Sequence, residues 1–129
     1  MAKIVILDDH PDICKFLRVL LASAGHEVRT SQVGDEAIDF GYLFQPDILI
    51  TDWRLNCEYD GLEVADAFRV ANKSIKTILM TGYSLSEVKK QVSNLDIFKI
   101  ITKPFSGDTI LKSVNEALKS QRQIGFSLN

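Results

Sequence analysis

In residues 46–54 a short apolar run ends in an acid: Pro46-Asp47-Ile48-Leu49-Ile50-Thr51-Asp52-Trp53-Arg54. An uninterrupted run of this kind is typical of a strand that is buried on both faces, as in a parallel sheet. Asp52 stands where that strand should end. It either opens a turn, where Asp is common, or is placed for chemistry, because ligands bind beyond the carboxyl ends of strands in open parallel sheets.

Four more strands are predicted, at residues 3–7, 27–31, 75–80 and 97–101. Residues 3–7 and 75–80 resemble the first run in being largely apolar or β-favouring, so these three strands should be central. Residues 27–31 alternate between polar and apolar side chains, which is typical of an edge strand.

Helical spacing of apolar residues separates these strands. The predicted helices cover residues 11–24, 34–44, 60–72 and 84–95, and Gly25 ends the first of them. A fifth helix is predicted after Ser106, which caps it, and its apolar pattern ends at Leu118. Asp60 with Glu63, and Ser84 with Glu87, have the spacing of capping boxes. Residues 121–129 show no helical pattern, so we expect one domain over 1–120 followed by a C-terminal tail over 121–129.

Strands that alternate with helices favour an α/β fold with a parallel sheet. Right-handed crossovers favour the strand order 2-1-3-4-5, as in flavodoxin-like folds, with five surrounding helices. In this order the first and third strands flank the point at which the chain direction across the sheet reverses.

Composition excludes several classes of protein. The 129 residues are 46% hydrophobic and 25% charged, with a net charge of −2, which is close to an average globular domain. No block of Lys or Arg indicates a nucleic-acid or membrane surface, and no apolar run approaches the ~20 residues of a membrane helix. Cys14 and Cys57 fit no metal spacing and are expected to be free thiols, so we expect a cytoplasmic protein.

The chemistry-bearing residues gather at the predicted strand ends. Asp8 and Asp9 follow the first strand, Asp52 ends the third, Thr81 follows the fourth and Lys103 follows the fifth. Adjacent strands lie ~4.8 Å apart, so Asp9 and Asp52 can share one ligand across the point where the strand order reverses. Three neighbouring carboxylates repel one another, and a hard divalent cation such as Mg²⁺ relieves that repulsion. The arrangement favours phosphoryl transfer with Asp52 as the nucleophile.

The same residues, together with Asp60-Gly61-Leu62-Glu63, Thr81-Gly82 and Lys103-Pro104-Phe105, resemble the receiver domain of two-component response regulators over about residues 3–120. The resemblance implies that Asp52 is the phosphoacceptor and that Asp9 and the main-chain carbonyl of Arg54 hold Mg²⁺, with Asp8 acting mainly through water. It also implies that Thr81 and Lys103 contact the phosphoryl group and that the Lys103–Pro104 peptide bond is cis.

The implied phosphoryl donor is a sensor histidine kinase or a histidine phosphotransfer protein, and the implied output is switched binding of an effector protein. Such a domain is not a classical enzyme; its chemistry is limited to its own phosphorylation and dephosphorylation. The sequence departs from the family at Ile100, where receivers commonly carry an aromatic residue, and in the loop after Asp52, which is one residue longer than usual.

Two other functions stay open at this stage. A pseudo-receiver would bind partners without phosphorylation, although the acid pair, Thr81 and Lys103 argue against it. A Mg²⁺-dependent phosphohydrolase using Asp52 would need an acid two residues after the nucleophile, where Arg54 stands.

Overall fold

The computed structural model describes residues 1–55, 60–92 and 97–127. Strands and helices alternate along the chain as predicted. They are β1 (Lys3–Leu7), α1 (Pro11–Ser23), β2 (Glu27–Ser31), α2 (Gly34–Phe44), β3 (Ile48–Asp52), α3 (Gly61–Ala71), β4 (Lys76–Thr81), α4 (Leu85–Val92), β5 (Lys99–Thr102) and α5 (Gly107–Ser127).

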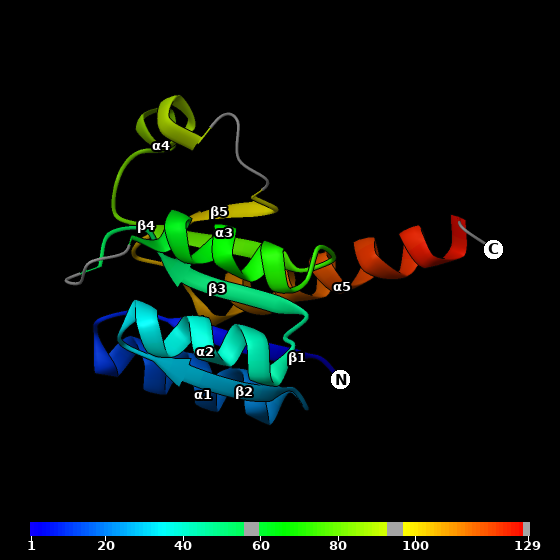
Figure 1. The fold of residues 1–129 in the computed structure, drawn as a ribbon. Coiled ribbons are helices and arrows are strands. Elements are labelled where there is room, and N and C mark those ends of the chain that lie inside the picture. Colours follow the sequence, from blue (N-terminus) through cyan, green and yellow to red (C-terminus); the bar gives the residue numbers. More distant parts are fainter. Residues whose placement is uncertain (56–59, 93–96, 128–129) are drawn as a thin grey trace.

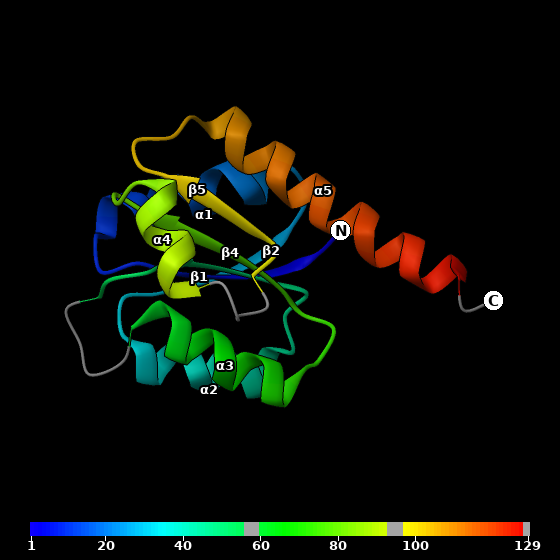
Figure 2. The same ribbon diagram turned by 90° about the horizontal axis from the view of Figure 1, so that it is seen from above.

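The five strands form one parallel sheet in the order β2-β1-β3-β4-β5, which confirms the predicted fold class. Helices cover both faces (Figures 1 and 2): α1 and α5 lie on one side, and α2 and α3 on the other. Successive residues of β1 alternate between the two layers, since Ile4 and Ile6 pack with α1 and α5 whereas Val5 and Leu7 pack with α2 and α3. This two-sided burial is the reason that the central strands carry consecutive apolar residues instead of alternating with polar ones.

Local signals fix several element ends. Gly25 has a φ of 96°, a left-handed conformation that favours glycine, and its N–H bonds to a carbonyl of the last turn of α1. Asp60 and Glu63 form the predicted capping box, with hydrogen bonds of 3.0 and 3.1 Å between each side chain and the other residue's N–H. The oxygen of Ser106 accepts from the Thr109 N–H at 3.3 Å and so caps α5.

The helix α5 continues to Ser127, past Leu118, where the predicted apolar pattern ends, and the assignment of residues 121–129 to a tail outside the domain stays a prediction. The apolar stripe ends near Leu118, but a helix is held by its backbone hydrogen bonds, and Gln and Arg at 121–123 favour that conformation. The expected continuation of α4 to Leu95 lies outside the described residues, as does Cys57.

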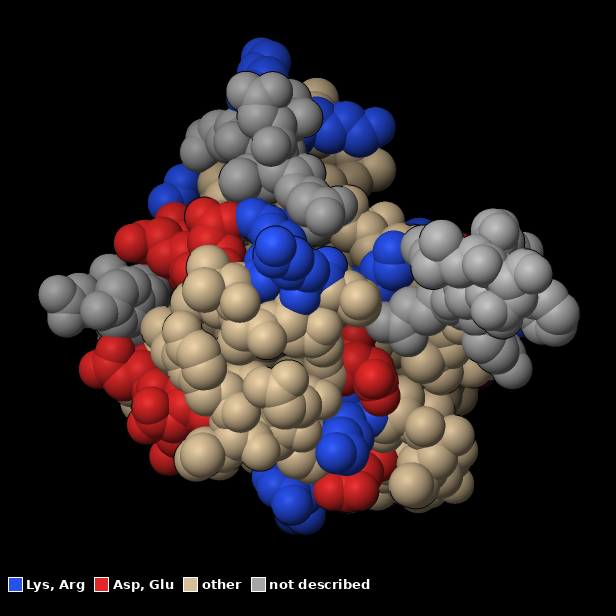
Figure 3. All heavy atoms as spheres, turned by 45° about the vertical axis from the view of Figure 1, so that its right-hand side comes forward, with Lys and Arg blue, Asp and Glu red and all other residues tan. Residues whose placement is uncertain are grey.

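The surface shows no dominant charge in the view of Figure 3. Basic and acidic side chains of the described residues are interspersed there around uncharged ones. No helix among the described residues is both long enough and apolar enough to span a bilayer.

Candidate functional site

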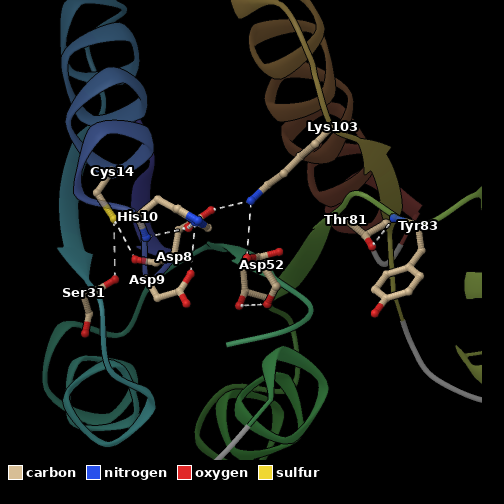
Figure 4. A network of polar contacts seen from close by, with 10 residues as sticks. Asp8, Asp9, His10, Cys14, Ser31, Asp52, Thr81, Tyr83 and Lys103 are labelled. Carbon is tan, nitrogen blue, oxygen red and sulfur yellow. Dashed lines mark hydrogen bonds and ion pairs between the residues drawn. The ribbon is translucent and has the colours of Figure 1, made fainter. Parts of the chain in front are cut away.

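The carboxyl ends of β1, β3, β4 and β5 meet at one edge of the sheet and bring the predicted residues together (Figure 4). Backbone hydrogen bonds continue the strand pairing into the loops. The Asp8 N–H donates to the Ser31 carbonyl at 3.1 Å, and the Lys103 N–H donates to the Thr81 carbonyl at 2.7 Å. These hydrogen bonds restrain the backbone of the residues that follow β1 and β5.

Lys103 joins two of the acids. Its Nζ lies 2.9 Å from Oδ2 of Asp8 and 3.3 Å from Oδ2 of Asp52. The Asp8 side chain is fully buried, and that of Asp52 is 10% exposed. Solvent screens ion pairs of such buried side chains only weakly. The ammonium group is therefore held between the carboxylates at the ends of β1 and β3.

Burial, and then the charge of Asp8, raise the pKa of Asp52, and Lys103 opposes this shift without cancelling it. Burial acts to lower the pKa of Lys103, but its hydrogen bond to Asp8 and the charges of Asp8 and Asp52 outweigh burial and raise it. The surroundings of Lys103 thus favour its ammonium form, and those of Asp52 make its carboxylate more basic than that of an exposed aspartate.

Thr81 and an aromatic cluster lie on the other side of Asp52. The Thr81 side chain is buried, and its Oγ1 accepts a hydrogen bond from the Tyr83 N–H at 3.0 Å. The rings of Trp53 and Tyr83 meet edge to face at 5.3 Å, and the Arg54 guanidinium lies 4.3 Å from the Trp53 ring centre. Arg54 and Tyr83, each two residues after Asp52 or Thr81, therefore belong to one cluster with Trp53 between them.

Gly61, the first residue of α3, lies against the carboxyl end of β3. Its N–H donates to the Trp53 carbonyl at 2.8 Å. A Cβ at this position would lie 2.1 Å from the Asp52 carbonyl oxygen, so only glycine permits this approach. Gly61 thus allows the start of α3 to pack directly against the backbone of Asp52.

His10 is a site residue that the sequence analysis missed. Its Nδ1 lies 2.8 Å from Oδ1 of Asp8 and 3.1 Å from Oδ1 of Asp9. The hydrogen bond to Asp8, and then the charges of Asp8 and Asp9, raise the pKa of His10. Its position directly after the acid pair was the available signal.

The acidic residues fit a divalent cation. Asp8, Asp9 and Asp52, with His10, each offer a ligand atom, and these atoms lie within 4.8 Å of one another. Carboxylate oxygens are the donors that Mg²⁺ prefers. The fit rests on this donor set, and the contribution expected of the Arg54 carbonyl stays a prediction.

A protein-family model, described as the response regulator receiver domain, matches residues 4–115. The chain belongs to this family. Similar curated proteins include the nitrogen assimilation regulatory protein NtrX of Azorhizobium caulinodans, 26% identical over 92% of this chain and 26% of the relative. The cell cycle transcriptional regulator CtrA of Caulobacter vibrioides is 22% identical over 93% of this chain and 52% of the relative.

Solved receiver structures have the same fold. The chemotaxis response regulator CheY4 of Vibrio cholerae superposes with a TM-score of 0.83 at 27% identity, over 91% of this chain and 98% of that one. NtrX from Brucella abortus gives a TM-score of 0.89 at 24% identity, over 98% of this chain and 29% of that one. The receiver domain described here thus spans about a quarter of the NtrX relative and about half of CtrA.

Proposed function

We propose that this receiver domain is switched by phosphorylation of Asp52. The observation that carries the proposal is the position of the Asp52 carboxylate, between Asp8 and Thr81 at the sheet edge and 3.3 Å from the Lys103 ammonium. A nucleophile beside a fixed cation is what transfer of an anionic group requires. The remaining acids, Asp8 and Asp9, would supply the charge that holds Mg²⁺.

In the proposed reaction an Asp52 oxygen forms a bond to phosphorus as the phosphorus–nitrogen bond of a phosphohistidine breaks. The electron pair of that bond leaves with the imidazole of a sensor histidine kinase or histidine phosphotransfer protein. Lys103 offsets the negative charge on the phosphoryl oxygens, and the Thr81 hydroxyl donates a hydrogen bond to one of them. Mg²⁺, held by Asp9, Asp52 and the Arg54 carbonyl with Asp8 acting through water, would neutralise further charge on the same oxygens.

The phosphoryl group would act as a switch because it adds a charge of about −1.5 to −2, if it resembles a hydroxyl phosphate. A charge-assisted hydrogen bond from Thr81 contributes about 1.5–3 kcal/mol, a shift of roughly 10- to 100-fold between two states. Nearby α4 is loosely packed, since Val88 is the only buried side chain among residues 85–90. We therefore propose that the surface of α4, β5 and α5 changes on phosphorylation and alters binding of an effector protein.

The proposal is tested by intact mass after incubation with Mg²⁺ and acetyl phosphate. We expect one phosphoryl adduct in the wild type, none without Mg²⁺ and none in Asp52→Asn. The matched control is Asp39→Asn, which alters an exposed carboxylate on α2 and should retain the adduct. Absence of an adduct in the wild type would overturn the proposal and favour a receiver that binds partners without phosphorylation.

A further inference from the structure

The His10 ring and the Lys103 ammonium contact different oxygens of Asp8. His10 Nδ1 lies 2.8 Å from Oδ1, whereas Lys103 Nζ lies 2.9 Å from Oδ2. The ring is also 3.1 Å from Asp9, so it stands above the acid pair that follows β1 (Figure 4). The side of the acid pair that faces away from Lys103 is therefore bordered by a nitrogen donor.

The backbone of His10 is restrained, whereas its ring has freedom to move. The His10 N–H donates to Asp8 Oδ1 at 2.9 Å, and Pro11 follows, which restricts the preceding residue to extended conformations. The observed φ of −96° and ψ of 111° agree with this restriction. The side chain is 64% exposed, so its ring can turn about χ1 and χ2 without displacing packed neighbours.

A nitrogen ligand changes which ions a site prefers. Mg²⁺ is bound through oxygen ligands and water. Imidazole suits Zn²⁺ and Ni²⁺, and affinity for mixed nitrogen and oxygen sites rises from Mn²⁺ toward Cu²⁺. Ligand atoms of Asp9, His10 and Asp52 lie within 4.8 Å of one another, so rotation of the exposed His10 ring could bring its nitrogen to an ion held by Asp9 and Asp52.

We infer that His10 is a direct metal ligand in this receiver domain and that it increases the affinity of the acidic site for first-row transition-metal ions relative to Mg²⁺. On binding, His10 Nδ1 would exchange its hydrogen bond with Asp8 Oδ1 for a bond to the metal, and Asp8 would still act through water. The inference deepens the proposed function and rests on the same metal site.

The first test compares dissociation constants for Mg²⁺, Mn²⁺ and Ni²⁺, measured by calorimetry and by fluorescence of Trp53, the only tryptophan. In His10→Asn and His10→Gln we expect Ni²⁺ to bind about tenfold or more weakly, with a much smaller change for Mg²⁺. His26→Gln, which alters the only other histidine, should behave as the wild type. An equal loss for all three ions would assign His10 an electrostatic role and overturn the inference.

The second test detects the bond itself. In His26→Gln protein carrying ¹⁵N-labelled histidine, pulsed electron paramagnetic resonance of the Mn²⁺ complex should show coupling to a directly bound ¹⁵N nucleus. The signal should disappear when His10→Asn is added. Lack of coupling in the His26→Gln protein would overturn the inference even if Mn²⁺ is bound.

The acetyl phosphate experiment separates this inference from the proposed function, because it uses wild-type protein with Mg²⁺. An Asp52 adduct without nitrogen coupling would leave phosphorylation intact and remove His10 from the ligands. Nitrogen coupling without an adduct would retain the metal site and remove the phosphorylation proposal.

Discussion

Replacement of Gly61 by alanine tests how the backbone around Asp52 is held. The new Cβ would lie 2.1 Å from the Asp52 carbonyl oxygen and 2.9 Å from Thr51 Oγ1. Both residues belong to β3, which is paired with a strand on each side. The strand therefore cannot move aside, and the start of α3 must shift instead, which weakens the 2.8 Å hydrogen bond from Gly61 to Trp53.

The expected cost follows from these contacts. Forcing an extra methyl group into a packed site costs about 1–3 kcal/mol, and loss of one backbone hydrogen bond costs about 1 kcal/mol. The lower entropy of the unfolded chain offsets about 0.4–1 kcal/mol. The free energy of unfolding should thus fall by about 1–3.6 kcal/mol, which lowers Tm by roughly 4–15 °C for a domain of this size.

The assay is guanidinium denaturation followed by fluorescence of Trp53, which is buried. The control is Gly82→Ala, where no heavy atom lies within 4 Å of the new Cβ, so stability should stay the same or rise by about 0.4–1 kcal/mol through the unfolded chain. If Gly61→Ala and Gly82→Ala unfold at the same denaturant concentration, glycine is not required for the close approach of α3 to β3, and the reasoning is refuted.

Three further predictions concern the site and the pH dependence of stability. Lys103→Ala should slow phosphorylation from acetyl phosphate because it removes the cation beside Asp52, whereas Lys99→Ala, which breaks a surface ion pair, should not; equal rates in both variants would contradict this. The double variant Arg54→Ala with Tyr83→Ala should lose its phosphoryl group faster than the wild type, since the stacked side chains beside Asp52 obstruct water, and an unchanged decay of the adduct mass would argue against such obstruction. Burial, and then the N-terminal amine, lower the pKa of His26, so the unfolded chain binds the proton more readily; the stability that neutral His26 provides is present above its ordinary pKa of 6.5 and is lost as the pH falls through the lower folded value. His26→Gln should therefore lose less stability than the wild type in denaturation experiments between pH 7 and pH 5, and parallel curves would contradict that assignment.

The strand order could be predicted because the polarity of each strand reflects how deeply it is buried in the sheet. Ile48–Asp52 pairs with strands on both sides and packs helices on both faces, so all five positions are buried and the first three are apolar. Glu27–Ser31 has a neighbour on one side only and retains polar side chains. The end of α5 could not be predicted in the same way, since its last turns to Ser127 follow no apolar periodicity. Apolar periodicity indicates which part of a helix packs against the core, and a helix can continue beyond the last packed turn.

The site shows the same division between what topology dictates and what side chains decide. Once the strands are parallel and ordered, the residues that follow β1, β3, β4 and β5 must meet, so Asp8, Asp52 and Lys103 could be brought together without coordinates. Lys103 lies 2.9 Å from Asp8 and 3.3 Å from Asp52. Which acid lies closer depends on side-chain conformation, which the spacing of residues in the sequence does not determine. The position of Lys103 bears on the proposed switch, because its ammonium lies near Asp8 and Asp52 at the same time. If Asp52 is phosphorylated as proposed, the phosphoryl group would share this ammonium with Asp8, and the added charge would act on the residue that follows β5.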